Sequence, residues 1–225
     1  MITNYTKQEE LIVPHEFHHR INVIGCGALG SWLVLFLLKM GFEDVHVYDF
    51  DTVEEHNIPN QVFKESDIGC LKVSAMSNIY GEFFKDEGVK KRLTTHNEKI
   101  CRNDAGKLRG IVFSAVDSMK ARKEIYEHSF KYGFSDLWLE ARIGLEGAYV
   151  YMLDKYDLEK YEKYEGTLYE DTEAELSACG VSQTALPAAV NCASIMIMQM
   201  IRWHKGEAQL WKIEYSVPEL VRMVA

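Results

Sequence analysis

The stretch Gly25-Cys26-Gly27-Ala28-Leu29-Gly30 decides the fold that we predict for this chain. It follows residues 20–24, a short apolar run typical of a buried parallel strand. It opens residues 28–40, a strongly apolar helix that Gly41 is well placed to end. Glycines in such a turn let the backbone approach a phosphate, and the free N–H groups of the helix start attract an anion. The glycine turn therefore predicts a nucleotide-binding α/β unit.

Strands and helices alternate along the rest of the chain, a pattern that indicates βαβ units. The predicted fold class is α/β, with a Rossmann-like, mostly parallel sheet flanked by helices and antiparallel strands toward the C-terminus. We predict strands at residues 45–49, 92–96, 110–115 and 210–215, helices at 71–84, 119–132 and 186–204, an ordered loop at 51–68, and an antiparallel hairpin formed by 137–141 and 148–153.

The length of 225 residues suits a single domain, which we expect to span residues 1–225. Its nucleotide-binding core is predicted at residues 20–122. The acidic, tyrosine-rich segment 155–178 is predicted as a crossover loop, with a frayed helix as the alternative. Residues 179–225 would supply the C-terminal helix and strand.

Composition limits the classes of partner and site. The net charge of -9 argues against a nucleic-acid partner, because neutralising phosphates requires a basic face. No run approaches the ~20 apolar residues of a membrane span. The polar, acidic start is unlike a secretory signal, so we expect a cytoplasmic protein. The five cysteines form no Cys-x-x-Cys pair, so we expect no zinc site.

Three charged residues lie at the ends of predicted strands or at the start of a predicted helix, where they could contact a nucleotide. Asp49 ends the second strand, where an acid hydrogen-bonds a ribose hydroxyl in NAD and ATP enzymes alike. Lys72 begins a helix, where a cation is misplaced unless an anion such as a triphosphate lies beside it; otherwise Lys72 is an ordinary solvated lysine. Asp117 follows the fourth strand and should face the same crevice, where a carboxylate near phosphates would hold Mg²⁺.

Four motifs occur in order: Gly-Cys-Gly-Ala-Leu-Gly-Ser, Asp-Phe-Asp-Thr-Val followed by Asn57 and Gln61, Ile-Gly-x-x-Lys72, and Val-Asp117. Together they resemble the ThiF/HesA/MoeB family, adenylating enzymes related to ubiquitin-activating enzymes. The resemblance covers residues 20–122 and resumes more loosely at 178–181 and in the helix after Leu186. The compact length is similar to that of the smaller, often phage-borne branch.

The resemblance implies an activity and a set of site residues. Family members bind ATP·Mg²⁺, usually as homodimers, and convert the C-terminal carboxylate of a ubiquitin-like or sulfur-carrier protein or peptide into an acyl-adenylate. Many then transfer the acyl group to a cysteine thiol or a sulfur donor. The resemblance assigns Lys72 and Asp117 to catalysis and Asp117 to the metal. It assigns Gly25, Gly27, Ala28, Gly30, Asp49, Asp51, Asn57, Asn60, Gln61 and Lys72 to the nucleotide.

Two features depart from the family pattern. Well-known members carry an arginine at the position of Asn60, and loss of that charge can cost about 3 kcal/mol in the transition state. Arg142 is a candidate replacement, as is Arg20 or another N-terminal residue of a partner subunit. Cys179 lies where some relatives carry a reactive cysteine, but a small packing residue is an equal interpretation, because buried free cysteines are common.

Three functions therefore stay open. The first is an ATP-dependent adenylyltransferase. The second is a catalytically weakened family member that binds nucleotide or a ubiquitin-like tail. The third is an NAD-dependent oxidoreductase, which shares the glycine turn and Asp49 but does not need the Asn57–Gln61 amides or Lys72.

Overall fold

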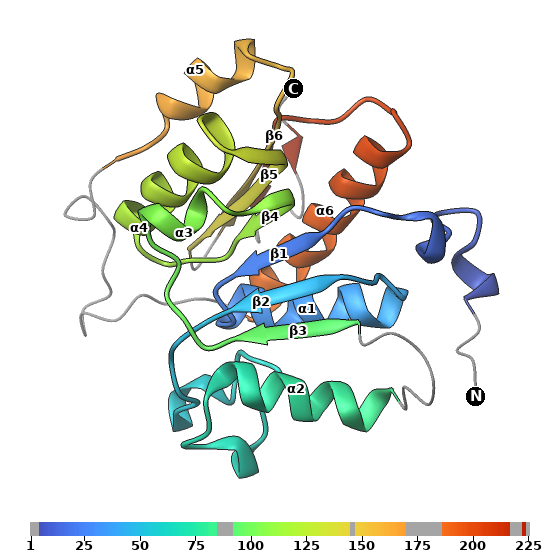
Figure 1. The fold of residues 1–225 in the computed structure, drawn as a ribbon, viewed down its shortest axis with the longest axis vertical. Helices are drawn as coiled ribbons and strands as arrows, with labels where there is room; N and C mark the ends of the chain where they lie inside the picture. The colour runs from blue at the N-terminus through green and yellow to red at the C-terminus, as the bar shows by residue number, and fades with distance from the viewer. Residues whose placement is uncertain (1–4, 85–91, 145–146, 170–185, 217–221, 224–225) are drawn as a thin grey trace.

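The computed structural model describes residues 5–84, 92–144, 147–169, 186–216 and 222–223 (Figure 1). Its centre is one sheet in the order β3-β2-β1-β4-β5-β6-β7-β8. Strands β3 to β5 in that order pair in parallel, and β6, β7 and β8 add antiparallel strands at one side. The predicted fold class is thus confirmed. The strands are β1 (Ile21–Ile24), β2 (Val45–Tyr48), β3 (Leu93–His96), β4 (Arg109–Ser114), β5 (Phe134–Ile143), β6 (Gly147–Asp154), β7 (Lys212–Ser216) and β8 (Arg222–Met223).

Helices cover both faces of the sheet. One face carries α1 (Ala28–Met40), α2 (Lys72–Phe83) and α6 (Leu186–His204), which enclose the larger hydrophobic core. The other carries α3 (Arg102–Ala105), α5 (Glu159–Glu165) and α4 (Met119–Ile125), the last continued by a π-helical turn over Tyr126–Lys131. Short 3-10 turns occur at Thr6–Gln8, Pro14–Glu16, Glu55–Asn57 and Glu65–Asp67.

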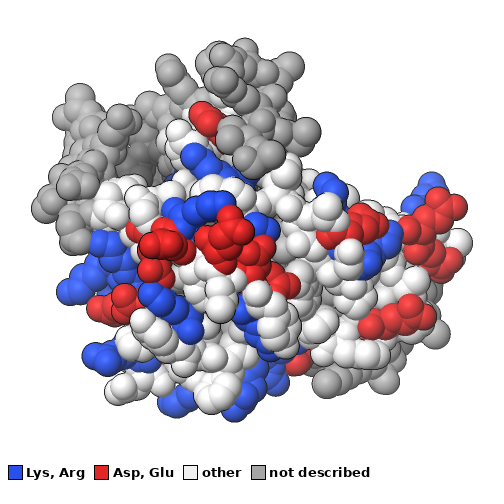
Figure 2. Space-filling view, turned by 90° about the horizontal axis from the view of Figure 1, so that it is seen from above, with Lys and Arg blue, Asp and Glu red and all other residues white. Residues whose placement is uncertain are grey.

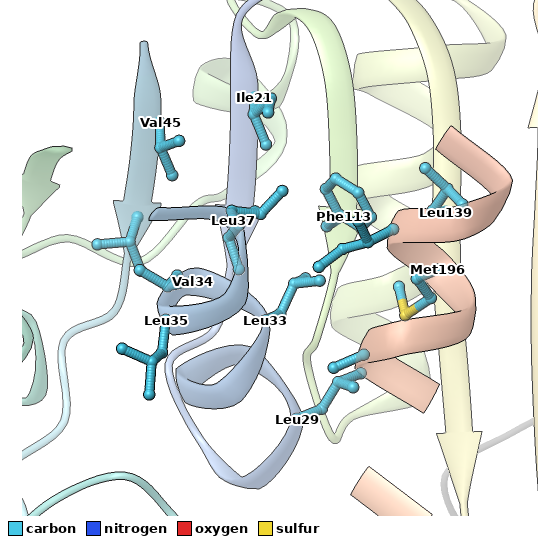
Figure 3. Packing of buried hydrophobic residues seen from close by; sticks show 14 of the residues in the cluster. Ile21, Leu29, Leu33, Val34, Leu35, Leu37, Val45, Phe113, Leu139 and Met196 are labelled. Carbon is cyan, nitrogen blue, oxygen red and sulfur yellow. The ribbon is translucent and has the colours of Figure 1, made fainter. Parts of the chain in front are cut away.

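The larger core is formed where α1 and α6 lie side by side on the sheet. In Figure 3, Leu33 and Leu37 of α1 point toward the strands, and Met196 of α6 lies near Leu139 of β5. All four side chains are buried completely. Because α1 is buried along most of its length, its start, which carries the glycine turn, is held firmly against the sheet.

Gly41 ends α1, as predicted. Its φ of +90° is in the left-handed region, and its N–H bonds the carbonyls of Leu37 and Leu38. An added Cβ would also lie 2.5 Å from the ring of Tyr5, so a larger residue does not fit there. Both observations explain a glycine at this helix end.

Most predicted elements are confirmed, including the β5–β6 hairpin and the helix that becomes α6. The prediction of a crossover loop over residues 155–178 needs correction where the structure describes it. Glu159–Glu165 forms helix α5, because Tyr164 is completely buried and gives this acidic segment one anchoring residue. Residues 170–178 lie outside the described part of the chain. The single-domain organisation stays a prediction.

Charged side chains of both signs lie on the surface (Figure 2). Lys and Arg side chains are interspersed with Asp and Glu on the face shown in Figure 2, so this face has no continuous basic area. In the described ranges, no helix combines the length and the apolar character needed to cross a membrane.

Candidate functional site

The glycine turn lies between β1 and α1, at the edge of the sheet toward which β1, β2 and β3 all point (Figure 1). Gly25 has a φ of +95°, and a Cβ added to it would lie 2.6 Å from the carbonyl oxygen of Ala115. A Cβ on Gly30 would lie 1.9 Å from the carbonyl oxygen of Gly25. These two glycines are required by the close packing of the turn itself.

Gly27 differs from the other two glycines of the turn. A Cβ added to it would meet no atom of the described residues within 4 Å, so open space lies in front of it in that part of the structure. Gly27 is the N-cap of α1, and no side chain caps this helix start. The first N–H groups of a helix have no partner within the helix and favour an anion. The space at Gly27 therefore fits a phosphate group.

Asp49 holds the turn in place from the end of β2. Its Oδ2 accepts the N–H of Cys26 at 2.6 Å, and its Oδ1 accepts the N–H of Asp51 at 2.8 Å. Asp49 is buried, as is Cys26, whose thiol has a raised pKa because of burial first and the charge of Asp49 second. Cys26 is therefore a packing residue, and Asp49 both buttresses the turn and presents its carboxylate at the sheet edge.

Lys72 forms an ion pair with Asp51 of the same chain. As the first residue of α2, its side chain is 10% exposed, and its Nζ lies 3.0 Å from Oδ2 of Asp51. The backbone N–H of Lys72 also donates to the carbonyl of Asp51 at 2.9 Å. The Asp51 side chain is 51% exposed, so the ion pair opens to solvent on the side of Asp51. A cation that is buried along its stem and fixed at its head is prepared to meet a further anion with little ordering cost.

The loop after Asp51 is fastened to the start of α1. The indole N–H of Trp32 donates to the carbonyl of Asn60 at 3.1 Å, and the N–H of Val62 donates to the hydroxyl of Ser31 at 3.3 Å. Asn57 is buried, and its Oδ1 accepts the N–H of Glu54 at 2.9 Å. The side-chain carbonyl oxygen of Asn57 therefore stabilises the shape of the loop.

Two amides of this loop carry unpartnered polar atoms. Asn60 Oδ1 and Gln61 Oε1 are buried and have no hydrogen-bond partner among the described residues. Burying an amide oxygen without a partner is costly, so such atoms indicate a missing donor. Ribose hydroxyls and metal-bound water are donors to such oxygens, and the NH₂ groups of the same amides donate to phosphate oxygens. The loop therefore fits a hydrated metal–nucleotide complex.

Asp117 is exposed, three residues after the end of β4. No hydrogen bond or ion pair joins it to another residue in the described part of the chain. Those ranges also contain no group of three or more His, Cys, Asp or Glu side chains placed to hold a metal ion. Mg²⁺ with a nucleotide needs only one or two carboxylates, because phosphates and water complete its coordination. Asp117 fits that limited role.

A buried charge cluster lies behind Asp117, and the sequence did not indicate it. Glu140 of β5 is fully buried and is met by Nε of Arg122 at 2.8 Å and Nε of Arg142 at 2.7 Å. Tyr164 donates its hydroxyl to Glu140 Oε2 at 2.8 Å, and burial, followed by the charge of Glu140, raises the pKa of Tyr164. A charged residue within an apolar strand was the only sequence signal for this cluster.

Neither candidate replacement for the missing arginine is free in this structure. Arg142 donates to the carbonyl and the hydroxyl of Thr167 at 2.6 and 3.0 Å, besides its bond to Glu140. Arg20 precedes β1 and pairs with Asp44, which precedes β2, so it lies at the opposite edge of the sheet from Gly25. From there it cannot reach the glycine turn of its own subunit.

The candidate thiols differ in what the structure says of them. Cys179 lies outside the described residues, so its role stays a prediction. Cys192 is completely buried within α6, and burial raises its pKa to about 12.

The structure brings together the glycine turn, Asp49, Asp51 and Lys72, with the Asp117 loop packed against Gly25.

Comparisons with known proteins identify the family of this chain. A sequence model of the ThiF family matches residues 15–222. The chain is 33% identical over 109 residues to the Nedd8-activating enzyme E1 catalytic subunit of Drosophila melanogaster, a match that covers 47% of this chain and 23% of that protein. It is 26% identical over 111 residues to SUMO-activating enzyme subunit 2 of Dictyostelium discoideum, covering 47% of this chain and 16% of that protein. The chain therefore spans less than a quarter of the length of these relatives.

Solved structures show the shared fold. A crystal structure of PaaA superposes with a TM-score of 0.70 at 18% identity, covering 96% of this chain and 70% of PaaA. The structure of E. coli MccB with ATP superposes with a TM-score of 0.68 at 14% identity, covering 92% of this chain and 63% of MccB. MccB has also been solved with MccA.

Proposed function

Because the chain belongs to the ThiF family, we propose that it is an ATP-dependent adenylyltransferase that activates a C-terminal carboxylate. The substrate is a ubiquitin-like protein, a sulfur-carrier protein or a peptide. The observation that carries the proposal is the pair Lys72–Asp51, fixed beside a glycine turn that leaves open space at Gly27. E. coli MccB, a fold neighbour, has been solved with ATP and with MccA, which supports ATP as the nucleotide.

The roles follow from the placement of the side chains. The helix start at Gly27 and Ala28 receives a phosphate group, with Gly25 and Gly30 shaping the turn. Asp49 accepts a ribose hydroxyl while its oxygens also accept the N–H groups of Cys26 and Asp51. Each carboxylate oxygen has room for a second hydrogen bond, so both tasks are compatible.

Lys72 stabilises the negative charge that develops on the phosphates, and Asn57, Asn60 and Gln61 supply amide contacts around it. Asp117 would hold Mg²⁺, which neutralises phosphate charge when it is bound. The substrate carboxylate attacks the α-phosphorus, the bond to the bridging oxygen breaks, and pyrophosphate leaves. Such a transfer depends mainly on positioning and charge stabilisation, which these residues provide.

Arg142 is our candidate for the charge that Asn60 lacks. To contact a phosphate it has to exchange its bonds to Thr167 for bonds to the nucleotide. Without that exchange the transition state has one cation fewer, and the expected rate is about a hundredfold lower. A homodimer, a thioester at Cys179 and a cytoplasmic location, all implied by the sequence, are further parts of the proposal.

The test uses two versions of one tail peptide, ending in a free carboxylate or in a carboxamide. Incubation with ATP and Mg²⁺ should release pyrophosphate and form the acyl-adenylate with the carboxylate only, since the neutral carboxamide lacks the nucleophilic carboxylate oxygen. ATP binding without pyrophosphate release on any tail would indicate the weakened binding module. Tight binding of NAD with none of ATP would indicate the oxidoreductase and refute the proposal.

A further inference from the structure

The buried cluster around Glu140 is connected to the proposed nucleotide site through one arginine. Arg122 comes from α4, which directly follows the loop that carries Asp117. Its Nε lies 2.8 Å from Oε2 of Glu140, and its Nη2 donates to the carbonyl of Val116 at 2.6 Å. The side chain of Arg122 is only 5% exposed. A single guanidinium therefore joins a buried carboxylate of β5 to the residue immediately before Asp117.

The carbonyl that Arg122 holds belongs to a loop with two roles in the site. On one side of Val116, the carbonyl of Ala115 packs so closely against the turn that a Cβ on Gly25 would lie 2.6 Å from it. On the other side is Asp117, exposed and unpartnered among the described residues. A shift of Val116 would therefore move the carboxylate proposed for the metal, whereas the glycine turn keeps its bond to Asp49.

The far end of the cluster is equally well fixed. Glu140 is fully buried, accepts hydrogen bonds from Arg142 and Tyr164, and forms an ion pair with Arg122. Tyr164 in turn accepts the indole N–H of Trp138 at 3.2 Å. Because every member is held by at least one neighbour, Arg122 cannot change its orientation without leaving buried charge unpaired.

We propose that Arg122 is a positioning residue of the nucleotide site, which acts through the Val116 carbonyl to fix Asp117 for Mg²⁺. The inference rests on the proposed function, because it concerns the same ATP·Mg²⁺ site. The planar guanidinium places Nε beside the Glu140 carboxylate while Nη2 donates to the Val116 carbonyl, whereas a lysine ammonium is a point charge on a flexible stem. Arg122→Lys therefore keeps a cation for Glu140 and loses the geometry that fixes Val116. A displacement of about 1 Å in a catalytic site can cost up to about a hundredfold.

The experiment measures ATP affinity by calorimetry with Mg²⁺ and with EDTA, and compares the ratio of the two between variants. Wild-type protein should bind ATP more tightly with Mg²⁺, and Asp117→Asn should reduce that ratio. Arg122→Lys should reduce it by roughly tenfold, while affinity in EDTA stays near that of the wild type. The double variant should match Asp117→Asn alone, because both changes act through one carboxylate.

The matched control is Tyr164→Phe, which weakens the same cluster without touching Val116. It should lower the melting temperature and leave the Mg²⁺ ratio unchanged. Arg122→Gln replaces Arg122→Lys if the lysine variant does not fold, since Arg142 and Tyr164 still meet Glu140.

Two results would overturn this inference and leave the proposed function standing. One is a folded Arg122 variant whose ratio of ATP affinities with Mg²⁺ and with EDTA equals that of the wild type. The other is an equal reduction of this ratio in Arg122→Lys and Tyr164→Phe. Absence of ATP binding by the wild-type protein would overturn the proposed function and this inference with it.

Discussion

Gly27→Ala should weaken ATP binding and leave the fold intact. The added Cβ meets no atom within 4 Å of its position, so the packing of the turn accepts it. Alanine is a poorer N-cap than glycine, and we expect the free energy of unfolding to fall by about 1 kcal/mol or less. In the proposed complex, however, the methyl group occupies the space of a phosphate. Losing one charge-assisted hydrogen bond costs roughly 1.5–3 kcal/mol, so affinity should fall about tenfold to a hundredfold.

The matched variant is Gly30→Ala, three residues along the same turn. Its Cβ would lie 1.9 Å from the carbonyl oxygen of Gly25, which has to move. Overpacking of this kind costs about 1–3 kcal/mol or more, so this variant should lose stability first. Calorimetric titration with ATP and thermal melting of both variants check the pair. Wild-type affinity in Gly27→Ala would show that no phosphate lies at the helix start and would refute our interpretation of the turn.

Three further predictions concern single side chains. Lys72→Met should reduce pyrophosphate release about a hundredfold with little change in melting temperature, because the charge faces the partly exposed Asp51; undiminished release would exclude Lys72 from catalysis. In the folded protein at pH 8, iodoacetamide should modify the exposed Cys70 and spare Cys26 and Cys192, because burial raises the pKa values of these two thiols. Peptide mass spectrometry measures the labelling, and a label on Cys26 or Cys192 would contradict the structure. Burial, followed by the charge of His46, lowers the pKa of His96 below its ordinary 6.5. The unfolded chain therefore takes up this proton first. The contribution of His96 to the free energy of unfolding should be fully present above pH 6.5 and be lost as the pH drops through the lowered pKa. Denaturant unfolding of His96→Gln should show a smaller loss on the acid side, and an unchanged pH profile would count against this assignment.

The positions of the strands through β5 could be predicted because their signals are local. Strand β1, for example, is a short apolar run, and the glycine turn marks where it leaves the sheet. Helix α3 has four residues, Arg102–Ala105, which is too short to show a period in the sequence. Helix α5 was difficult for a different reason: its surface is rich in Glu and Lys, and one residue, Tyr164, anchors it in the core.

The candidate site was predictable as a set of positions and less so as a set of contacts. The sequence shows that Lys72 begins a helix and needs an anion, but Asp51 meets it from 21 residues earlier. The three glycines of the turn look alike in the sequence, yet only Gly27 faces open space. The burial of Glu140 beside Arg122 and Tyr164 depends on three segments meeting, β5, α4 and α5, which no local pattern records.

The central claim is that this chain uses ATP to adenylate a carboxylate, and pyrophosphate exchange tests it most directly. With Mg²⁺ and a suitable tail peptide, label from pyrophosphate should enter ATP, because formation of an acyl-adenylate is reversible on the enzyme. The exchange should require the free carboxylate of the tail and disappear in Asp117→Asn. Exchange that persists without Asp117, or with the carboxamide tail, would contradict the account.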